Sequence, residues 1–290
     1  MLTPGQVDRL QKRGKRLGEG QFSTASKIRW QGADAVLKTP TRQLDLQRFV
    51  YEFKLLRDLD GAGGAPRALG LSLHPPAQII SFAGPQTLYE FLEEERSVTE
   101  LFDIAVDLCE KVIEIHNKNI IHNDIKPDNI IIDAAGKVHL IDLGNANEKG
   151  RYFNMKYENG KSLRWLGPEV YSEHKSTPAQ DAYSVGYTLR TLSSMMGGDL
   201  NVEGIAAQMM QREPHERTSI PSALDLLKAL RKGVLSPQSS DMSPQSSDMS
   251  PQSSDMSPQS SDMSPQSSDM SPQSSDMSPR QTENDMSPSP

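Results

Sequence analysis

The sequence predicts an α+β protein with two lobes, a small β-rich half and a larger helical half, followed by a disordered C-terminal repeat tail. Three observations support this prediction. Short β-like stretches come first, amphipathic helical segments dominate later, and the last part is almost only Ser, Pro, Gln, Asp and Met. A cleft between two such lobes is a common place for a ligand.

The β-rich half contains five short stretches in which β-branched, aromatic and other apolar residues are bounded by Gly, Pro or Asp. They are KRLGEGQF, ASKIRWQG, ADAVLK, ALGLSL and AQIISF. One helix is expected between the third and fourth stretches, from about residue 44 to 59. Its apolar residues recur on one side. They are Leu46, Phe49, Val50, Phe53 and Leu56.

The helical half follows the segment PQTLYEFLEEE. A long amphipathic helix is expected from about Val98 to Lys118, and it leads into the polar segment HNDIKPDN at 122–129. The strand pair IIID and VHLID comes next, and the remainder is mostly helical. The single cysteine, Cys109, falls in the apolar pattern of the long helix, so we expect a buried structural thiol and a reducing compartment.

The tail is a strict repeat, in which SPQSSDM occurs six times from Ser236 to Met277. A proline every seventh residue blocks a helix, and the segment has too little apolar surface to fold. We therefore predict a folded domain at 12–232 and a disordered tail at 236–290. The repeats are either an expanded DNA unit with little functional meaning, or a functional segment that serves as a string of Ser-Pro phosphoacceptor sites or as a docking tether. A flexible chain of this length spans on the order of 40 Å, enough to reach its own domain.

Charge and composition argue against several functional classes. The chain carries a net charge of −7, and the tail alone holds eight acidic residues against one arginine, so residues 1–235 are neutral overall. No basic field points to nucleic acid and no polybasic segment points to a membrane. The sequence shows neither a long apolar run nor a signal segment, and its six histidines lack metal-site spacing. An intracellular protein is expected, cytoplasmic or nuclear.

Two features of the β-rich half favour phosphate binding. Gly18 and Gly20 lie between two predicted strands, where glycines let backbone N–H groups approach a phosphate. Lys38 ends the apolar strand AVLK, and a cation inside the fold needs an anionic partner. Glu52 on the following helix is the candidate, although two ordinary surface charges would give the same pattern.

The segment HNDIKPDN adds the groups that phosphoryl transfer requires. Asp124 can orient a hydroxyl or accept its proton, and Lys126 can neutralise charge on a transferring phosphoryl group. Asn129 offers a neutral oxygen, and Asp142 closes the next strand in HLIDLG. A carboxylate beside an amide oxygen makes a hard, oxygen-only cation site of the Mg²⁺ type.

Residues 12–232 resemble a eukaryotic-type protein kinase domain, because the signature segments of that family occur in order. The motifs are Gly18-x-Gly20, AVLK, HNDIKPDN, DLG, GPE, DAYSVGYTL and PHERTS. The resemblance implies a bilobal kinase fold that binds ATP and Mg²⁺. It implies that Gly18, Gly20, Lys38 and Glu52 serve the phosphates and that the adenine meets the backbone near Ser81 to Ala83.

The same resemblance assigns the remaining site residues. Asp124 and Lys126 would be catalytic, and Asn129 and Asp142 would hold the metal. Three residues would support the site: Asp181 would brace the catalytic loop, and Arg217 would pair with Glu169.

Departures from the family pattern carry information. Asn123 stands where the family often has Arg, which makes the chain a non-RD variant with HND and DLG motifs. Asn cannot make a charged, bidentate contact with a phosphate, so we expect activity to depend little on activation-segment phosphorylation. Only about 36 residues separate Asp181 from Arg217, which leaves little room for the helix that many kinases use for docking.

The expected function is a Ser/Thr protein kinase acting on protein substrates, with its own Ser-Pro tail as one candidate. Lys126, two residues after the Asp, resembles Ser/Thr rather than Tyr kinases. A pseudokinase scaffold and a small-molecule kinase remain as alternatives, the latter because HND also occurs in kinases resembling choline kinases. Mg-ATP turnover separates the first two, and the destination of the phosphate separates the first from the third.

Overall fold

The computed structural model describes residues 2–20, 23–41, 46–153, 162–172 and 174–235. The tail at 236–290, for which disorder is predicted, lies outside the described residues. The described chain forms the predicted α+β, two-lobed kinase fold: an antiparallel sheet with its helices comes first, and a mostly helical lobe follows. Within the described residues, no helix has the length and apolar composition that crossing a bilayer requires.

The first lobe is built on a five-stranded antiparallel sheet. Its strands in spatial order are β1 (Lys15–Glu19), β2 (Ser23–Trp30), β3 (Ala33–Pro40), β5 (Pro76–Ser81) and β4 (Ala68–Leu73). The two-residue loop between β2 and β3 consists of Gln31 and Gly32, both with positive φ, which suits the twist of a tight hairpin. The five predicted stretches are therefore neighbouring strands of one sheet.

Helix α2 (Leu46–Leu59) forms as predicted, but its buried face differs from the expected one. Val50 and Phe53 are only half-buried, whereas the helix buries Phe49, Glu52, Leu55, Leu56 and Leu59. The face is turned because the carboxylate of Glu52 points into the protein toward a cation on β3, which a count of apolar residues cannot detect.

Helix α1 (Pro4–Arg13) precedes the sheet and was not predicted. Thr3 caps it in a reciprocal pair with Gln6, and Pro4 occupies its first turn. Its residue Val7 packs into a small apolar cluster of the sheet made by Ile28, Ala35, Leu37, Ala77 and Ile79. The predicted domain boundary of 12–232 stays a prediction, and most of this helix lies before residue 12.

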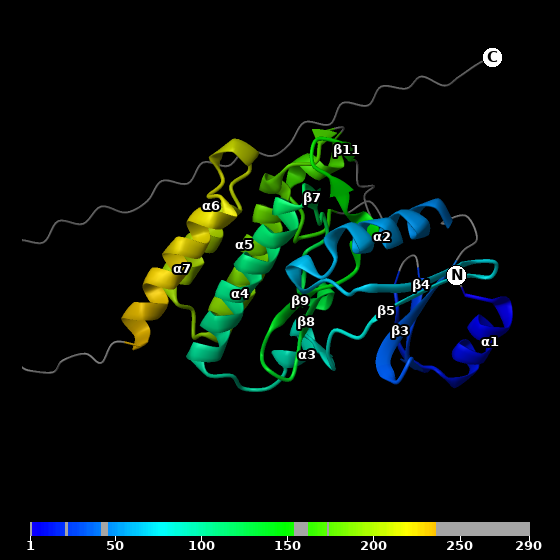
Figure 1. Cartoon of the computed structure of the whole chain (residues 1–290). Helices are drawn as coiled ribbons and strands as arrows, with labels where there is room; N and C mark the ends of the chain where they lie inside the picture. Colours follow the sequence, from blue (N-terminus) through cyan, green and yellow to red (C-terminus); the bar gives the residue numbers. More distant parts are fainter. Residues whose placement is uncertain (1, 21–22, 42–45, 154–161, 173, 236–290) are drawn as a thin grey trace, which may run out of the picture. The chain divides into compact units, whose positions relative to one another are not determined.

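The second lobe is centred on helix α4 (Val98–Asn117), whose ten buried residues include Cys109. Helices α5 (Pro178–Met195) and α7 (Ile220–Leu235) pack against it, and Figure 1 shows α7 running alongside α4. Helix α6 (Leu200–Met209) packs against α5 and α7. Burial raises the pKa of the Cys109 thiol to about 12, which agrees with the predicted structural thiol. Gly186 lets α5 approach α6, because a Cβ there would meet Met209 at 2.9 Å.

Short elements connect the lobes and carry the polar loops. The helical ones are α3 (Leu88–Phe91), η2 (Ala62–Gly64), η3 (Pro127–Asn129), η4 (Leu143–Asn145), η5 (Pro168–Tyr171) and η6 (Pro214–Glu216). Strand β8 (Ile130–Ile132) pairs antiparallel with β6 (Gln86–Thr87) on one side and with β9 (Val138–Leu140) on the other. Two further antiparallel pairs are β7 (Ile120–Ile121) with β10 (Asn147–Glu148) and β11 (Tyr152–Phe153) with β12 (His174–Lys175). The loops after β7 and β9 hold HNDIKPDN and DLG.

Candidate functional site

A buried ion pair joins the sheet to helix α2. Lys38 on β3 donates from Nζ to Glu52 Oε1 at 2.6 Å, and both side chains are almost completely buried. The register of β3 and β5 sets Lys38 opposite Gln78, whose amide donates to the other oxygen of Glu52 at 3.1 Å. The carboxylate therefore has a partner on each oxygen, and its position on α2 is fixed.

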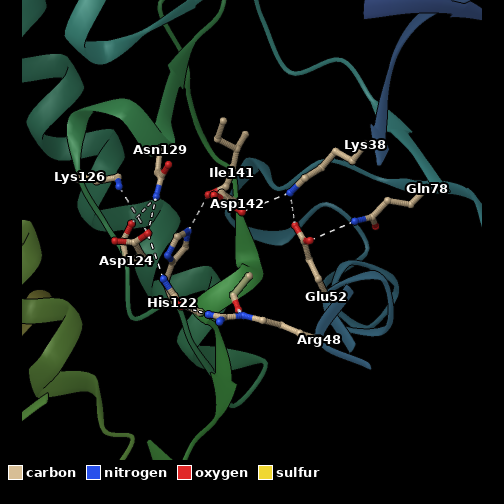
Figure 2. Close-up of polar contacts among 12 residues, drawn as sticks. Lys38, Arg48, Glu52, Gln78, His122, Asp124, Lys126, Asn129, Ile141 and Asp142 are labelled. Carbon is tan, nitrogen blue, oxygen red and sulfur yellow. Dashed lines mark hydrogen bonds and ion pairs between the residues drawn. The ribbon is translucent and has the colours of Figure 1, made fainter. Parts of the chain in front are cut away.

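The same lysine also reaches the segment that follows β9. Its Nζ lies 3.3 Å from Asp142 Oδ1, so Lys38 is shared by two carboxylates (Figure 2). Burial alone would lower the pKa of Lys38, but the charges of Asp142 and Glu52 outweigh it and raise that pKa above its usual range. In turn, the Lys38 ammonium holds the pKa of Asp142 below its ordinary value. Lys38 and Asp142 are thus both charged near neutral pH.

Asp142 has a backbone conformation that non-glycine residues seldom adopt. Its φ is 62° and its ψ is 73°, in the left-handed region. Asp and Asn tolerate this region better than other side chains do, and such strained positions cluster at functional sites. The turn ends the strand sharply and directs the carboxylate toward Lys38, while 44% of the side chain stays exposed.

The loop after β7 arranges donors around a second carboxylate. Trp165 Nε1 donates to Asp124 Oδ1 at 2.8 Å, and the amide of Asn129 donates to Asp124 Oδ2 at 3.1 Å. Lys126 Nζ lies 3.7 Å from the same oxygen and 4.6 Å from the centre of the Trp165 ring. Burial raises the pKa of Asp124, and Lys126 and Trp165 oppose that rise.

The amide nitrogen of Asn129 donates to Asp124, and this orients the amide oxygen of the same side chain. The nitrogen also donates to the Asp124 carbonyl at 2.9 Å. Its oxygen therefore points away from Asp124, as Figure 2 shows. No group of three His, Cys, Asp or Glu side chains with metal-site geometry occurs in the described part of the chain.

One cavity of about 570 Å³ collects most of the predicted site. The predicted residues that line it are Gly18, Gly20, Lys38, Ser81, Ala83, Asp124, Lys126, Asn129 and Asp142. Glu52 lies behind Lys38, outside this lining. A larger cavity of about 880 Å³ lies beside α4 and α7, where Lys228 pairs with Glu110 and Arg231 with Asp103, and it holds none of the predicted groups. The chemistry therefore identifies the smaller cavity as the candidate site.

The glycines at the rim take slightly different places from those expected. Gly18 lies within β1, opposite Ala25 and next to an irregularity in the register, rather than between strands. Gly20 follows β1, and its N–H donates to the Ser23 carbonyl at 2.8 Å. Positions 21 and 22, between them and β2, lie outside the described residues.

Three predicted residues lie away from the cavity and hold the loops. Asp181 on α5 is fully buried and accepts the backbone N–H groups of His122 and Asn123, each at 2.8 Å. His116 lies 2.8 Å from the same carboxylate. These hydrogen bonds outweigh burial and hold the pKa of Asp181 below its ordinary value. The loop that carries Asp124 is thereby attached to α5.

Arg217 and Glu169 form the other supporting contact. The guanidinium meets both oxygens of Glu169, at 2.6 and 2.7 Å, in a bidentate pair. This pair joins the GPE segment to the chain just before α7.

Four further residues belong to the site and were missed from the sequence: Arg48, Gln78, Asn145 and Trp165. Position alone offered some signal, since Arg48 lies one helical turn before Glu52 and Asn145 follows DLG directly. Gln78 and Trp165 had no such signal, because cross-strand register and loop closure bring them to the site. Asn123 is also part of the network, with φ at 62° and an amide that donates to the Asn145 carbonyl at 3.2 Å.

Comparison with known proteins agrees with this geometry. Residues 11–199 match the family model described as "Protein kinase domain". A probable serine/threonine-protein kinase of Dictyostelium discoideum is 28% identical over 192 residues, which is 61% of this chain and 14% of that protein.

Two kinases of Arabidopsis thaliana are also similar. Serine/threonine-protein kinase CTR1 is 23% identical over 262 residues, 77% of this chain and 32% of its own length. Serine/threonine-protein kinase STY46 is 29% identical over 160 residues, 53% of this chain and 28% of its own length. The chain thus spans less than a third of these curated relatives.

Proposed function

Because this chain belongs to the protein kinase domain family, we propose that it is an active serine/threonine protein kinase, which transfers the γ-phosphoryl group of Mg-ATP to a protein hydroxyl. The observation that carries the proposal is the convergence of Lys38, Asp124, Lys126, Asn129 and Asp142 on one cavity. A scaffold without turnover would have no need for all five. The three relatives named above are serine/threonine kinases, which favours that acceptor class.

In this proposal the first lobe binds the nucleotide. Lys38, held by Glu52, is the cation for the α- and β-phosphates, because the pair fixes its ammonium at the cavity. The backbone at Gly18 and Gly20 lies at the rim, where N–H groups can approach phosphate oxygens. Ser81 and Ala83 line the same cavity at the end of β5 and offer backbone groups to the adenine.

Asp142 and Asn129 are the residues that would hold Mg²⁺. A half-exposed carboxylate and an amide oxygen turned away from Asp124 are hard donors that fit this ion. When bound, the ion neutralises charge that develops on the phosphate oxygens during transfer. Lys38 keeps the pKa of Asp142 low, so this carboxylate is ionised and ready to bind a cation at neutral pH.

Asp124 orients the acceptor hydroxyl for in-line attack and receives its proton, which burial favours by raising the pKa of Asp124. Lys126 lies close enough to steady the transferred phosphoryl group. Asp181 supports this step by holding the loop, and the Glu169–Arg217 pair supports the segment that follows. The kinase domain proper at 12–232, an intracellular location and protein substrates belong to the same proposal.

The test is transfer of label from γ-labelled ATP with Mg²⁺, using the purified full-length chain, a generic protein acceptor and Asp142→Asn as the blank. Label on the acceptor that disappears in the blank supports the proposal. Label on the chain itself would be mapped by mass spectrometry to decide whether the Ser-Pro repeats are substrates.

ATP binding without transfer to protein would overturn the proposal. Small alcohols and amines would then be tried as acceptors, since a metabolite kinase transfers to these. Absence of transfer to any acceptor would leave a pseudokinase.

A further inference from the structure

Helix α2 also contacts the segment after Asp142 directly, apart from the Lys38–Glu52 pair that joins it to the sheet. Arg48 lies in its first turn, four residues before Glu52, and Figure 2 shows it reaching toward the segment after Asp142. Its Nε donates to the Gly144 carbonyl at 2.5 Å, and its Nη2 donates to Asn145 Oδ1. The guanidinium therefore binds the DLG motif at the backbone oxygen of Gly144 and the residue that follows it at the side-chain oxygen of Asn145.

Asn145 passes this contact on to the catalytic loop. Its amide nitrogen donates to Asp124 Oδ2 at 3.3 Å, while its amide oxygen receives Arg48. The orientation of the amide is forced, because arginine only donates and a carboxylate only accepts. A flipped amide would set N–H groups against the guanidinium and oxygen against the carboxylate. Asn145 thus connects Arg48 to Asp124 in one direction only.

We propose that Arg48, acting through Asn145, positions Asp124 for phosphoryl transfer and so couples helix α2 to the catalytic loop. This inference rests on the proposed kinase activity of the same site. Arg48 and Asn145 are positioning residues, since Arg48 contacts Asn145 and Asn145 in turn contacts Asp124. One helix then fixes both sides of the cleft: Glu52 holds Lys38, and Arg48 holds Asn145 and through it Asp124.

The residue at position 123 lies beside this chain of contacts. Asn123, where the family often has arginine, is 1% exposed and donates to the Asn145 carbonyl and to Ser176 Oγ. Asn145 is therefore held from α2 on its side chain and from the catalytic loop on its backbone. Assembly of the cleft through Arg48 accounts for how a kinase with a neutral residue at position 123 can align Asp124.

The test compares steady-state kinetics of full-length variants. Arg48→Met should lower kcat by roughly 10–100-fold, as losing a residue that orients a catalytic group does, with the KM for ATP changed far less. Arg57→Met is the matched control, because Arg57 is an exposed arginine on the same helix, and its kcat should stay at the wild-type value. Equal kcat values for these two variants would overturn the proposal.

Asn145→Asp separates positioning from stability. An aspartate keeps an acceptor for Arg48 but loses the donor to Asp124, so kcat should fall as far as in Asn145→Ala while thermal stability is retained. The double variant Arg48→Met/Asn145→Ala should have a kcat no lower than Asn145→Ala, because the two residues act in one chain of contacts. If the fold-losses in kcat of the two single variants multiply in the double variant, or if Asn145→Asp is fully active, the proposed chain of contacts is contradicted.

Failure of the proposed function can be told apart from failure of this inference. If the wild-type chain transfers no phosphate, the proposed function is wrong. Amide hydrogen exchange then tests whether Arg48 is coupled to the segment after Asp142. Arg48→Met should then speed amide exchange across 142–146, whereas Arg57→Met should not. Unchanged exchange in Arg48→Met would overturn the coupling as well.

Discussion

Lys38 and Arg217 are both buried cations, but their surroundings are of opposite kinds. Arg217 uses all five of its N–H groups: two reach Glu169, and the others reach the carbonyls of Ala179, Gln211 and Arg212 at 2.8 to 3.0 Å. Its side chain is 1% exposed. Lys38 instead lies between two carboxylates, one of which, on Asp142, stays half-exposed at the cavity.

The difference indicates which cluster serves the fold and which serves a ligand. A fully paired cation has no donor left for another molecule, so the Arg217–Glu169 pair can only hold chain segments together. The Lys38 cluster has opposite charges at a cavity wall and a carboxylate that can still take a cation. Incomplete pairing at a cavity, rather than buried charge alone, is therefore what singles out the Lys38 cluster as the candidate site.

The largest effect that tests this comparison is expected for Lys38→Met. Phosphate transfer should fall by about 10³-fold or more, because the variant removes a fixed cation where charge develops. The protein should stay folded, since Glu52 keeps its hydrogen bond from Gln78. The measurement is transfer of labelled phosphate, with circular dichroism to check the fold. Lys54→Met, at an exposed lysine of α2, is the control, and turnover within tenfold of wild type in Lys38→Met would refute the assignment.

The converse effect is expected for Arg217→Met. Removing this arginine strands the Glu169 carboxylate and three carbonyl groups, which should lower the free energy of unfolding by about 3–5 kcal/mol. Urea denaturation measures it, and Arg212→Met, at a side chain that is 86% exposed, should change little. A stability loss for Arg217→Met no larger than that of the control would show that the paired cluster is not what holds this segment.

Asp181 extends the comparison to a closed cluster around a buried anion. Its pKa lies below the ordinary value of 3.8, so its ionised form stabilises the fold above that pH, and this contribution is lost as the pH falls through the lower folded pKa. Wild-type stability should therefore drop below about pH 4. Asp181→Asn should be less stable at neutral pH and should lose less on acidification, as measured by urea unfolding between pH 3 and 7. Parallel curves for the two proteins would contradict this.

Much of the fold could be predicted because the deciding signals are local. The β2–β3 hairpin, the α4 helix and the order of strands before helices all follow from period and turn residues. Helix α1 was missed although Thr3, Pro4 and Gln6 mark its start, because a ten-residue segment with two strong apolar positions gives a weak pattern. Its burial depends on a sheet that does not exist until distant strands pair.

The candidate site divides in the same way. Residues in ordered motifs were named from the sequence, and the structure brings nine of them to one cavity. Arg48 and Trp165 were not, because their partners lie 97 and 41 positions away along the chain and are set by loop closure. The order of the motifs predicts which residues form the site, whereas the contacts that orient each group arise from tertiary packing.

The smallest expected effect concerns Ser162, an exposed residue of the segment before GPE. A phosphate there would need a charged partner, but Asn123 is neutral, almost fully buried and already bonded to Asn145 and Ser176. Ser162→Ala should thus keep kcat within about twofold of wild type, as a surface substitution does. Phosphatase-treated wild-type protein is the matched comparison, and a tenfold loss in either protein would mean that phosphate on this segment aligns Asp124 in place of Arg48.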